Sequence, residues 1–226
     1  MLLRAVAFCV VLYSSLCGAE IKVIDDTGNA VTLAGPAKRI VSLAPHLTEL
    51  LFSLNVGSRV VGTVRFSDYP EAAKSIPVLG DAFAISLESI VSSEPELVVA
   101  WHTGGANNII ERLRTLGIPV YVNEALDLKS IARSIKSLAV LVGKAEYGET
   151  LALKFEDEIS RLQEVYVSTN KKVFFQISDQ SLFTINDSHL IGQAISVCGV
   201  QNIFCLLYTS DAADDSLRVD LGGRRI

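Results

Sequence analysis

The chain has little of the residue types that mark common enzyme and metal-protein classes. Its 226 residues include four cysteines, three histidines and one tryptophan. The sequence contains no G-x-S-x-G nucleophile motif and no H-E-x-x-H zinc motif, and none of the three histidines lies near a cysteine or an activated serine in sequence, so no catalytic triad is visible. Only Cys198 is expected to belong to the mature fold. We therefore expect no catalytic residues, no metal ligands and no catalytic cofactor, and predict that the protein is not an enzyme.

Positive charge is also scarce. The chain has 20 lysines and arginines against 25 acidic residues, a net charge of -5, and no basic cluster. Because nucleic-acid binding depends on concentrated positive charge, no nucleic-acid partner is expected. Half of the residues are hydrophobic, which is enough for a sizeable core.

The two ends of the chain differ in composition from the rest. Residues 1–19 combine a short positive start, an apolar stretch at 5–16 that is too short to cross a bilayer comfortably, and small residues at 17–19. This pattern predicts a secretory signal peptide and a periplasmic mature protein. Residues 205–226 resemble translated sequencing adapter, so we expect a non-native tail and a protein truncated after Phe204.

Strands and helices alternate through most of the chain. A hairpin is expected at 21–33, around a polar turn at 25–29. From 39 to 142, short apolar strands alternate with helices that carry one apolar stripe, such as Leu47, Leu50, Leu51 and Leu54. This alternation predicts a right-handed parallel α/β unit.

The expected domain organisation follows from the same patterns. An N-terminal α/β lobe should occupy residues 20–143 and a long linking helix residues 144–168. The start of a second, truncated α/β lobe should occupy residues 169–204. Within this second lobe a strand is expected at 173–177 and a helix at 189–197.

Aromatic residues follow two of the predicted strands of the first lobe. Phe66 and Tyr69 lie in the turn at 66–70, directly after the apolar run at 60–64, and Trp101 follows the strand at 97–100. Open α/β sheets place ligands at the carboxyl ends of their strands. Rigid aromatic rings there suit a flat, largely apolar ligand. His46, at the start of the first helix, could contact a ligand or metal, or could equally be a solvated or capping histidine.

These segments resemble the periplasmic cobalamin-binding proteins that feed vitamin B12 importers of the ATP-binding-cassette class, within the wider iron-siderophore, haem and cobalamin family. The likeness runs from about residue 39 to residue 204. The motifs are RIVSLAPHLTELLFSLNVG (39–57), FSDYP (66–70), LESIVSSEPELVVAW (87–101), LGIPVYV (116–122) and VCGVQNIF (197–204). The resemblance implies a two-lobed α/β substrate-binding protein, with parallel-sheet lobes joined by a long helix and the ligand between them.

The resemblance also implies roles for individual residues. Phe66, Trp101 and Phe183 match family positions whose aromatic rings contact the corrin. The family often has a tryptophan at the position of Ala82, and Phe83 beside it is the expected substitute. Glu88 matches an acidic residue that docks to arginines of the membrane permease. The implied partners are cobalamin, as transported ligand, and the inner-membrane permease subunits, and the protein is expected to be a monomer.

Other ligands and other classes remain as alternatives. A haem-binding protein of the same fold would use Tyr69, His46 or His102 as axial ligand. A ferric-siderophore binder would favour arginines around the cleft, and only Arg65 lies near the aromatic turn. A secreted enzyme would be supported by turnover of an ester or peptide.

Overall fold

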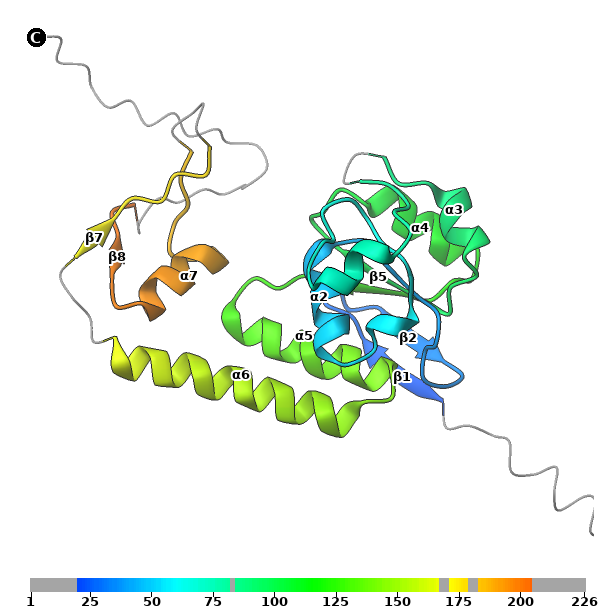
Figure 1. The fold of residues 1–226 in the computed structure, drawn as a ribbon, viewed down its shortest axis with the longest axis horizontal. Coiled ribbons are helices and arrows are strands. Elements are labelled where there is room, and N and C mark those ends of the chain that lie inside the picture. The colour runs from blue at the N-terminus through cyan, green and yellow to red at the C-terminus, as the bar shows by residue number, and fades with distance from the viewer. Residues whose placement is uncertain (1–19, 82–83, 167–170, 179–182, 205–226) are drawn as a thin grey trace, which may run out of the picture. The chain divides into compact units, whose positions relative to one another are not determined.

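The computed structural model describes residues 20–81, 84–166, 171–178 and 183–204, which form two compact units (Figure 1). Unit 1 contains the chain up to Glu124 together with residues 135–149. Unit 2 contains residues 125–134 and the chain from Thr150 onward. Both units combine helices with parallel strands, so the predicted α/β class is confirmed. The lobe boundaries expected from the sequence stay predictions.

Unit 1 opens with the predicted hairpin. Strands β1 (Ile21–Ile24) and β2 (Ala30–Leu33) pair antiparallel, with Ile21 opposite Leu33. Asp25 closes the turn between them, because its Oδ1 accepts from the backbone N–H groups of Thr27 and Asn29 at 3.0 and 2.8 Å. Gly28 has a φ of +84°, a backbone conformation that glycine adopts readily and that residues with a side chain rarely adopt.

A four-stranded parallel sheet forms the centre of unit 1. Its strands are β3 (Ile40–Ser42), β4 (Val60–Gly62), β5 (Leu97–Trp101) and β6 (Val120–Asn123), in the order β4-β3-β5-β6. The chain passes from β3 to β4 on one side and then to β5 on the other. The strand order therefore reverses at β3, and open α/β sheets bind ligands at the carboxyl ends of strands beside such a reversal.

Helices cover the sheet and bury its apolar residues. The helical segments of unit 1 that begin and end before Glu124 are α2 (Pro45–Ser53), η2 (Gly57–Arg59), η3 (Glu71–Ser75), α3 (Leu87–Ser92) and α4 (Asn107–Thr115). On one sheet face, alternate strand residues such as Val98 and Val120 pack with Ile90 of α3 and with Ile110 and Leu113 of α4. This alternation follows from the two-residue period of a strand.

Two longer helices have residues in both units. They are α5 (Leu128–Leu141) and α6 (Ala145–Val165). Within unit 1 the start of α6 lies beside the end of α5 (Figure 1), where Gly148 approaches Ala139 closely and Lys136 pairs with Glu149 at 2.7 Å. No helix in the described ranges is both long and apolar enough to cross a membrane.

Unit 2 contains α7 (Leu190–Val197) and a short parallel pair, β7 (Lys172–Val173) with β8 (Gln201–Asn202). The predicted strand at 173–177 was too long, because pairing with β8 ends at Val173. Residues 77–79 form no regular strand, and Val78 makes an isolated parallel bridge to Thr63.

Candidate ligand-binding edge

Four side chains lie at or shortly after the carboxyl ends of the four parallel strands of unit 1. His46 follows β3, Phe66 follows β4, Trp101 ends β5 and Asn123 ends β6. Strands β4 and β5 flank β3, so the points at which they end lie roughly 10 Å apart at ordinary strand spacing. This edge is large enough to present aromatic side chains to one broad ligand.

Phe66 is held outward in an unusual backbone conformation. Its φ is +69°, in the left-handed region, and its side chain is 74% exposed. A non-glycine residue there costs roughly 1–2 kcal/mol. Tyr69, in the same turn, is 67% exposed. Backbone strain together with an exposed aromatic is typical of ligand-contacting positions.

Trp101 lies half in the sheet and half in solvent. The four preceding residues of β5 are buried, whereas Trp101 is 39% exposed and pairs with Asn123 of β6 in the parallel register. Its ring meets the His46 ring edge to face, with centroids 5.4 Å apart. The tryptophan ring is therefore oriented by His46 and keeps part of its surface exposed.

His46 is fixed by a chain of polar contacts. Its Nε2 lies 3.3 Å from Oδ1 of Asn123, and Nδ2 of Asn123 donates to Oδ2 of Asp26 at 2.9 Å. A carboxylate accepts only, so the amide N–H points to Asp26, the amide oxygen faces His46, and Nε2 donates. Burial lowers the pKa of His46 below its usual value, although the Asn123 contact and the charges of Glu49 and Glu124 oppose this. The imidazole is neutral at pH 7.

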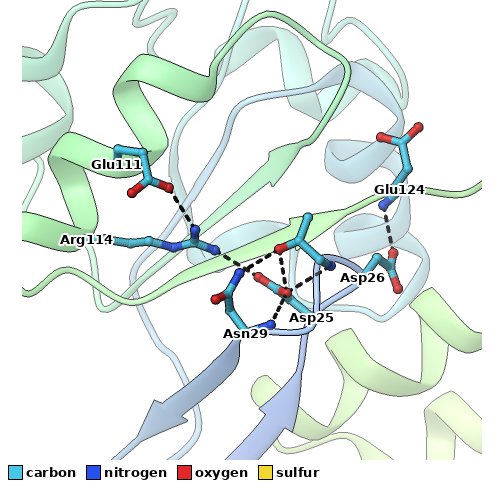
Figure 2. A network of polar contacts seen from close by, with 7 residues as sticks. Asp25, Asp26, Asn29, Glu111, Arg114 and Glu124 are labelled. Carbon is cyan, nitrogen blue, oxygen red and sulfur yellow. Dashed lines mark hydrogen bonds and ion pairs between the residues drawn. The ribbon is translucent and has the colours of Figure 1, made fainter.

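The hairpin turn docks on the end of β6 (Figure 2). The N–H of Asp26 donates to the Val122 carbonyl at 3.0 Å, and the N–H of Glu124 donates to Oδ2 of Asp26 at 2.7 Å. The buried Asp25 pairs with Nη2 of Arg114 at 3.0 Å. Asp25 thus attaches the hairpin turn to α4, and Asp26 attaches it to the end of β6.

The loop after β5 is tied to the same place. Thr103 donates to the Glu124 carboxylate from its backbone N–H at 3.1 Å and from its hydroxyl at 3.2 Å. The N–H of His102 donates to the Asn123 carbonyl at 2.9 Å. Residues 123 and 124 therefore hold both His46 and the loop that follows Trp101.

The other residues predicted from the sequence lie elsewhere. Glu88 is exposed in the first turn of α3, which Ser86 caps by accepting from the N–H of Ser89 at 3.1 Å. Phe183 belongs to unit 2 and is 38% exposed, and its carbonyl accepts from the N–H of Ile177 at 2.9 Å. Phe83 lies outside the described residues. The ligand-binding role of Phe66, Trp101 and Phe183, and the docking role of Glu88, stay predictions.

Sequence reasoning did not identify Asn123 or Asp26. Asn123 carries a usable signal, because it is a polar residue that ends a buried strand at the edge where Trp101 also lies. Asp26 carries none, since a polar hairpin turn is ordinary and its partner is 97 residues away.

Unit 2 also has an open groove of about 590 Å³. Its lining includes Leu128 of α5, Phe155 and Ile159 of α6, and Val197 of α7. None of the predicted ligand-binding residues contributes to this groove.

Comparison with known proteins defines the class. A family model described as "Periplasmic binding protein" matches residues 40–212. The match covers well over half of the chain, and the chain therefore belongs to the periplasmic binding protein family.

Individual relatives agree with this class. The vitamin B12-binding protein of Vibrio campbellii is 35% identical over 171 residues, which cover 75% of this chain and 62% of that protein. The solved periplasmic vitamin B12-binding protein of Vibrio cholerae has a TM-score of 0.68 at 30% identity, covering 77% of this chain and 69% of the other. A periplasmic heme-binding protein from Roseiflexus has a TM-score of 0.66 at 27% identity, covering 74% and 65%. The chain spans 62% of the length of the Vibrio campbellii relative.

Proposed function

We propose that the protein is a periplasmic substrate-binding protein that captures cobalamin and delivers it to an ABC-type permease, without catalysing a reaction. The observation that carries the proposal is the aromatic carboxyl edge of unit 1. Phe66 is held outward at a cost in backbone energy, and Trp101 is half exposed and oriented by His46. The similarity to vitamin B12-binding proteins supports the choice of ligand.

The physical basis of binding is the burial of flat rings against a flat macrocycle. Aromatic side chains bury a large area with few rotatable bonds, and their stacked or edge contacts add about 1 kcal/mol each beyond the area term. Phe183 of unit 2 is proposed as a further aromatic contact, and Phe83 as another. No charged side chain is required in this step.

Delivery is assigned to Glu88. Its carboxylate is exposed at the start of a short capped helix, and within the described ranges it has no ion-pair partner. An exposed carboxylate can pair with arginines of a permease on docking. A monomeric periplasmic protein exported by the signal at residues 1–19 fits this role.

The test is a titration of the purified protein with cyanocobalamin, followed by quenching of the Trp101 fluorescence and by calorimetry. Saturable one-to-one binding, lost on Trp101→Ala with the fold retained, is the expected result. An absence of heat and quenching up to millimolar ligand would overturn the proposal.

Haem is the second candidate. The exposed phenol of Tyr69, on the turn that carries Phe66, and the likeness to a heme-binding protein favour it. Titration with hemin separates the two ligands, because a tyrosine-ligated haem shifts its Soret band and Tyr69→Phe would abolish that shift. Saturable binding of hemin, together with no binding of cyanocobalamin, would identify haem rather than cobalamin as the ligand.

A further inference from the structure

Asn123 is the junction of the polar contacts at the carboxyl edge. Its side chain is buried and lies between the Asp26 carboxylate and the His46 ring, and its carbonyl accepts from the N–H of His102. A buried amide can face its neighbours in either of two orientations that differ by exchange of oxygen and nitrogen. The neighbouring groups therefore determine whether the oxygen or the nitrogen of the Asn123 amide faces His46.

The Asp26 carboxylate determines this orientation of the Asn123 amide. This carboxylate accepts only, so it holds the N–H end of the Asn123 amide and leaves the oxygen toward His46. Asp26 is itself held at two further points, by Val122 through its backbone N–H and by Glu124 through its carboxylate. Figure 2 shows this carboxylate turned toward the Glu124 N–H, away from the Asp25–Arg114 pair.

Asp26 is connected to Trp101 through two sets of contacts. The amide oxygen of Asn123 selects the Nε2–H tautomer of His46 and fixes the plane of its ring, against which Trp101 packs edge to face. In addition, Asp26 anchors the backbone of Glu124, whose carboxylate holds Thr103 in the loop after Trp101. One carboxylate therefore supports both the ring beside Trp101 and the loop that follows it.

We propose that Asp26 is a positioning residue for ligand binding, which acts through Asn123 and His46, and through Glu124 and Thr103, to hold Trp101 in its binding orientation. The N-terminal hairpin is then part of the binding machinery although it contributes no contact to the ligand. The inference rests on the proposed function, and its first test needs no ligand.

That test compares the full protein with its Asp26→Ala variant by ¹⁵N NMR of the histidine rings and by time-resolved anisotropy of the single tryptophan. The wild type is expected to show His46 in the Nε2–H tautomer and Trp101 with restricted motion. In the variant the Asn123 amide can turn, so His46 should show mixed tautomers and Trp101 faster depolarisation. Unchanged His46 and Trp101 signals in a folded variant would overturn the proposal.

Arg114→Met is the matched control, because it removes the ion pair of the neighbouring Asp25 in the same turn and leaves Asp26 and its hydrogen bonds in place. It is expected to lower stability while the His46 and Trp101 signals stay as in the wild type. If Arg114→Met changes these signals as much as Asp26→Ala does, the effect is general loosening of the hairpin and the proposal fails. Should Asp26→Ala not fold, Asp26→Leu replaces it. Leucine has nearly the same shape but offers no acceptor to the Asn123 amide, so mixed His46 tautomers are again expected. Wild-type signals in this variant would overturn the proposal.

The ligand arm measures cyanocobalamin affinity. Loss of a hydrogen bond to a charged group corresponds to about tenfold, and this is the expected rise in Kd for Asp26→Ala, with Arg114→Met near the wild-type value. A wild-type Kd in Asp26→Ala would overturn the positioning role. If the wild type itself binds no cyanocobalamin, the proposed function fails, while the NMR and anisotropy comparison still decides whether Asp26 orients His46 and Trp101.

Discussion

At the scale of single residues, Phe66 combines an energetic cost with a proposed binding role. Its left-handed φ of +69° is unfavourable, and its exposed ring is not packed into the core. A residue kept in this state without a packing reason indicates selection for something other than stability.

Phe66→Gly is expected to stabilise the fold and weaken cobalamin binding. Relief of about 1–2 kcal/mol of strain exceeds the roughly 0.5–1 kcal/mol of added unfolded-state entropy, so the free energy of unfolding should rise by about 0.5 kcal/mol. Affinity should fall about tenfold, because an aromatic contact and its buried area are lost. Urea denaturation and calorimetric titration measure the two effects.

The control for this prediction is Glu94→Gly. Glu94 has φ +47° and is exposed, and it lies in the loop after α3 rather than in the aromatic turn. It should gain stability in the same way with no change in Kd. A Phe66→Gly protein that binds cyanocobalamin as tightly as the wild type would remove Phe66 from the site.

His46 should make stability depend on pH in the mildly acidic range. Burial lowers its folded-state pKa, whereas in the unfolded chain the pKa is about 6.5. Between these two values the unfolded state binds more protons, so stability rises with pH there. The contribution is complete above about pH 6.5 and is lost as pH falls through the folded-state pKa.

The measurement is the difference in unfolding free energy between the wild type and His46→Gln from pH 7.5 to pH 5. The wild type should lose stability relative to the variant as pH falls. The control is His102→Gln, which changes an exposed histidine in the loop after β5. It should lose stability on acidification as the wild type does. A difference that stays constant with pH, or grows in favour of the wild type on acidification, would contradict the burial effect.

At the scale of elements, the hairpin turn is attached to α4 by a buried carboxylate. Arg114→Met leaves Asp25 buried without its cation, and removing one partner of such a pair is costly. Because Arg114 is partly exposed, the expected loss is about 2–3 kcal/mol in the free energy of unfolding.

Arg112→Met, an exposed arginine on the same helix, is the comparison and should cost less than about 0.5 kcal/mol. Urea denaturation of the wild type, Arg114→Met and Arg112→Met measures the two losses of stability. Equal midpoints for the two variants would show that the Asp25–Arg114 pair contributes nothing specific.

The elements also show what sequence patterns can and cannot predict. Apolar runs and helical stripes predicted β3, β5, α4 and α5 because periodicity reports local burial. The segment at 173–177 was equally apolar, yet its extent as a strand depends on a partner that pairs over two residues only. The Asp26–Asn123 contact joins residues 97 positions apart, and local periodicity carries no information about such a pair.

For the site, the sequence showed where aromatic side chains follow strands but not how they are held. Trp101 was expected at the carboxyl end of its strand, and its partial exposure there agrees with that expectation. Its contact with His46 depends on a strand order in which β5 lies beside β3, and this order is a property of the folded sheet.

At the scale of the whole molecule, capture and delivery should be separable. Cobalamin binding is proposed to rest on uncharged aromatic surface, whereas docking is proposed to rest on the exposed carboxylate of Glu88. Salt screens exposed charges with a Debye length of about 8 Å at physiological ionic strength, and it affects apolar contacts much less. Docking to the permease should therefore weaken with salt under conditions in which the Kd for cyanocobalamin changes little.

Glu88→Lys tests this separation. The variant should bind cyanocobalamin with wild-type affinity but support little uptake in cells whose own B12-binding protein is deleted, because a lysine repels the arginines with which Glu88 is proposed to pair. Glu164→Lys makes the same charge change at an exposed position of α6 and should support normal uptake. If both variants impair uptake equally, net charge rather than a docking contact at Glu88 is responsible. If neither does, docking relies on other residues, and Glu88 serves only as a favourable acid in the first turn of α3.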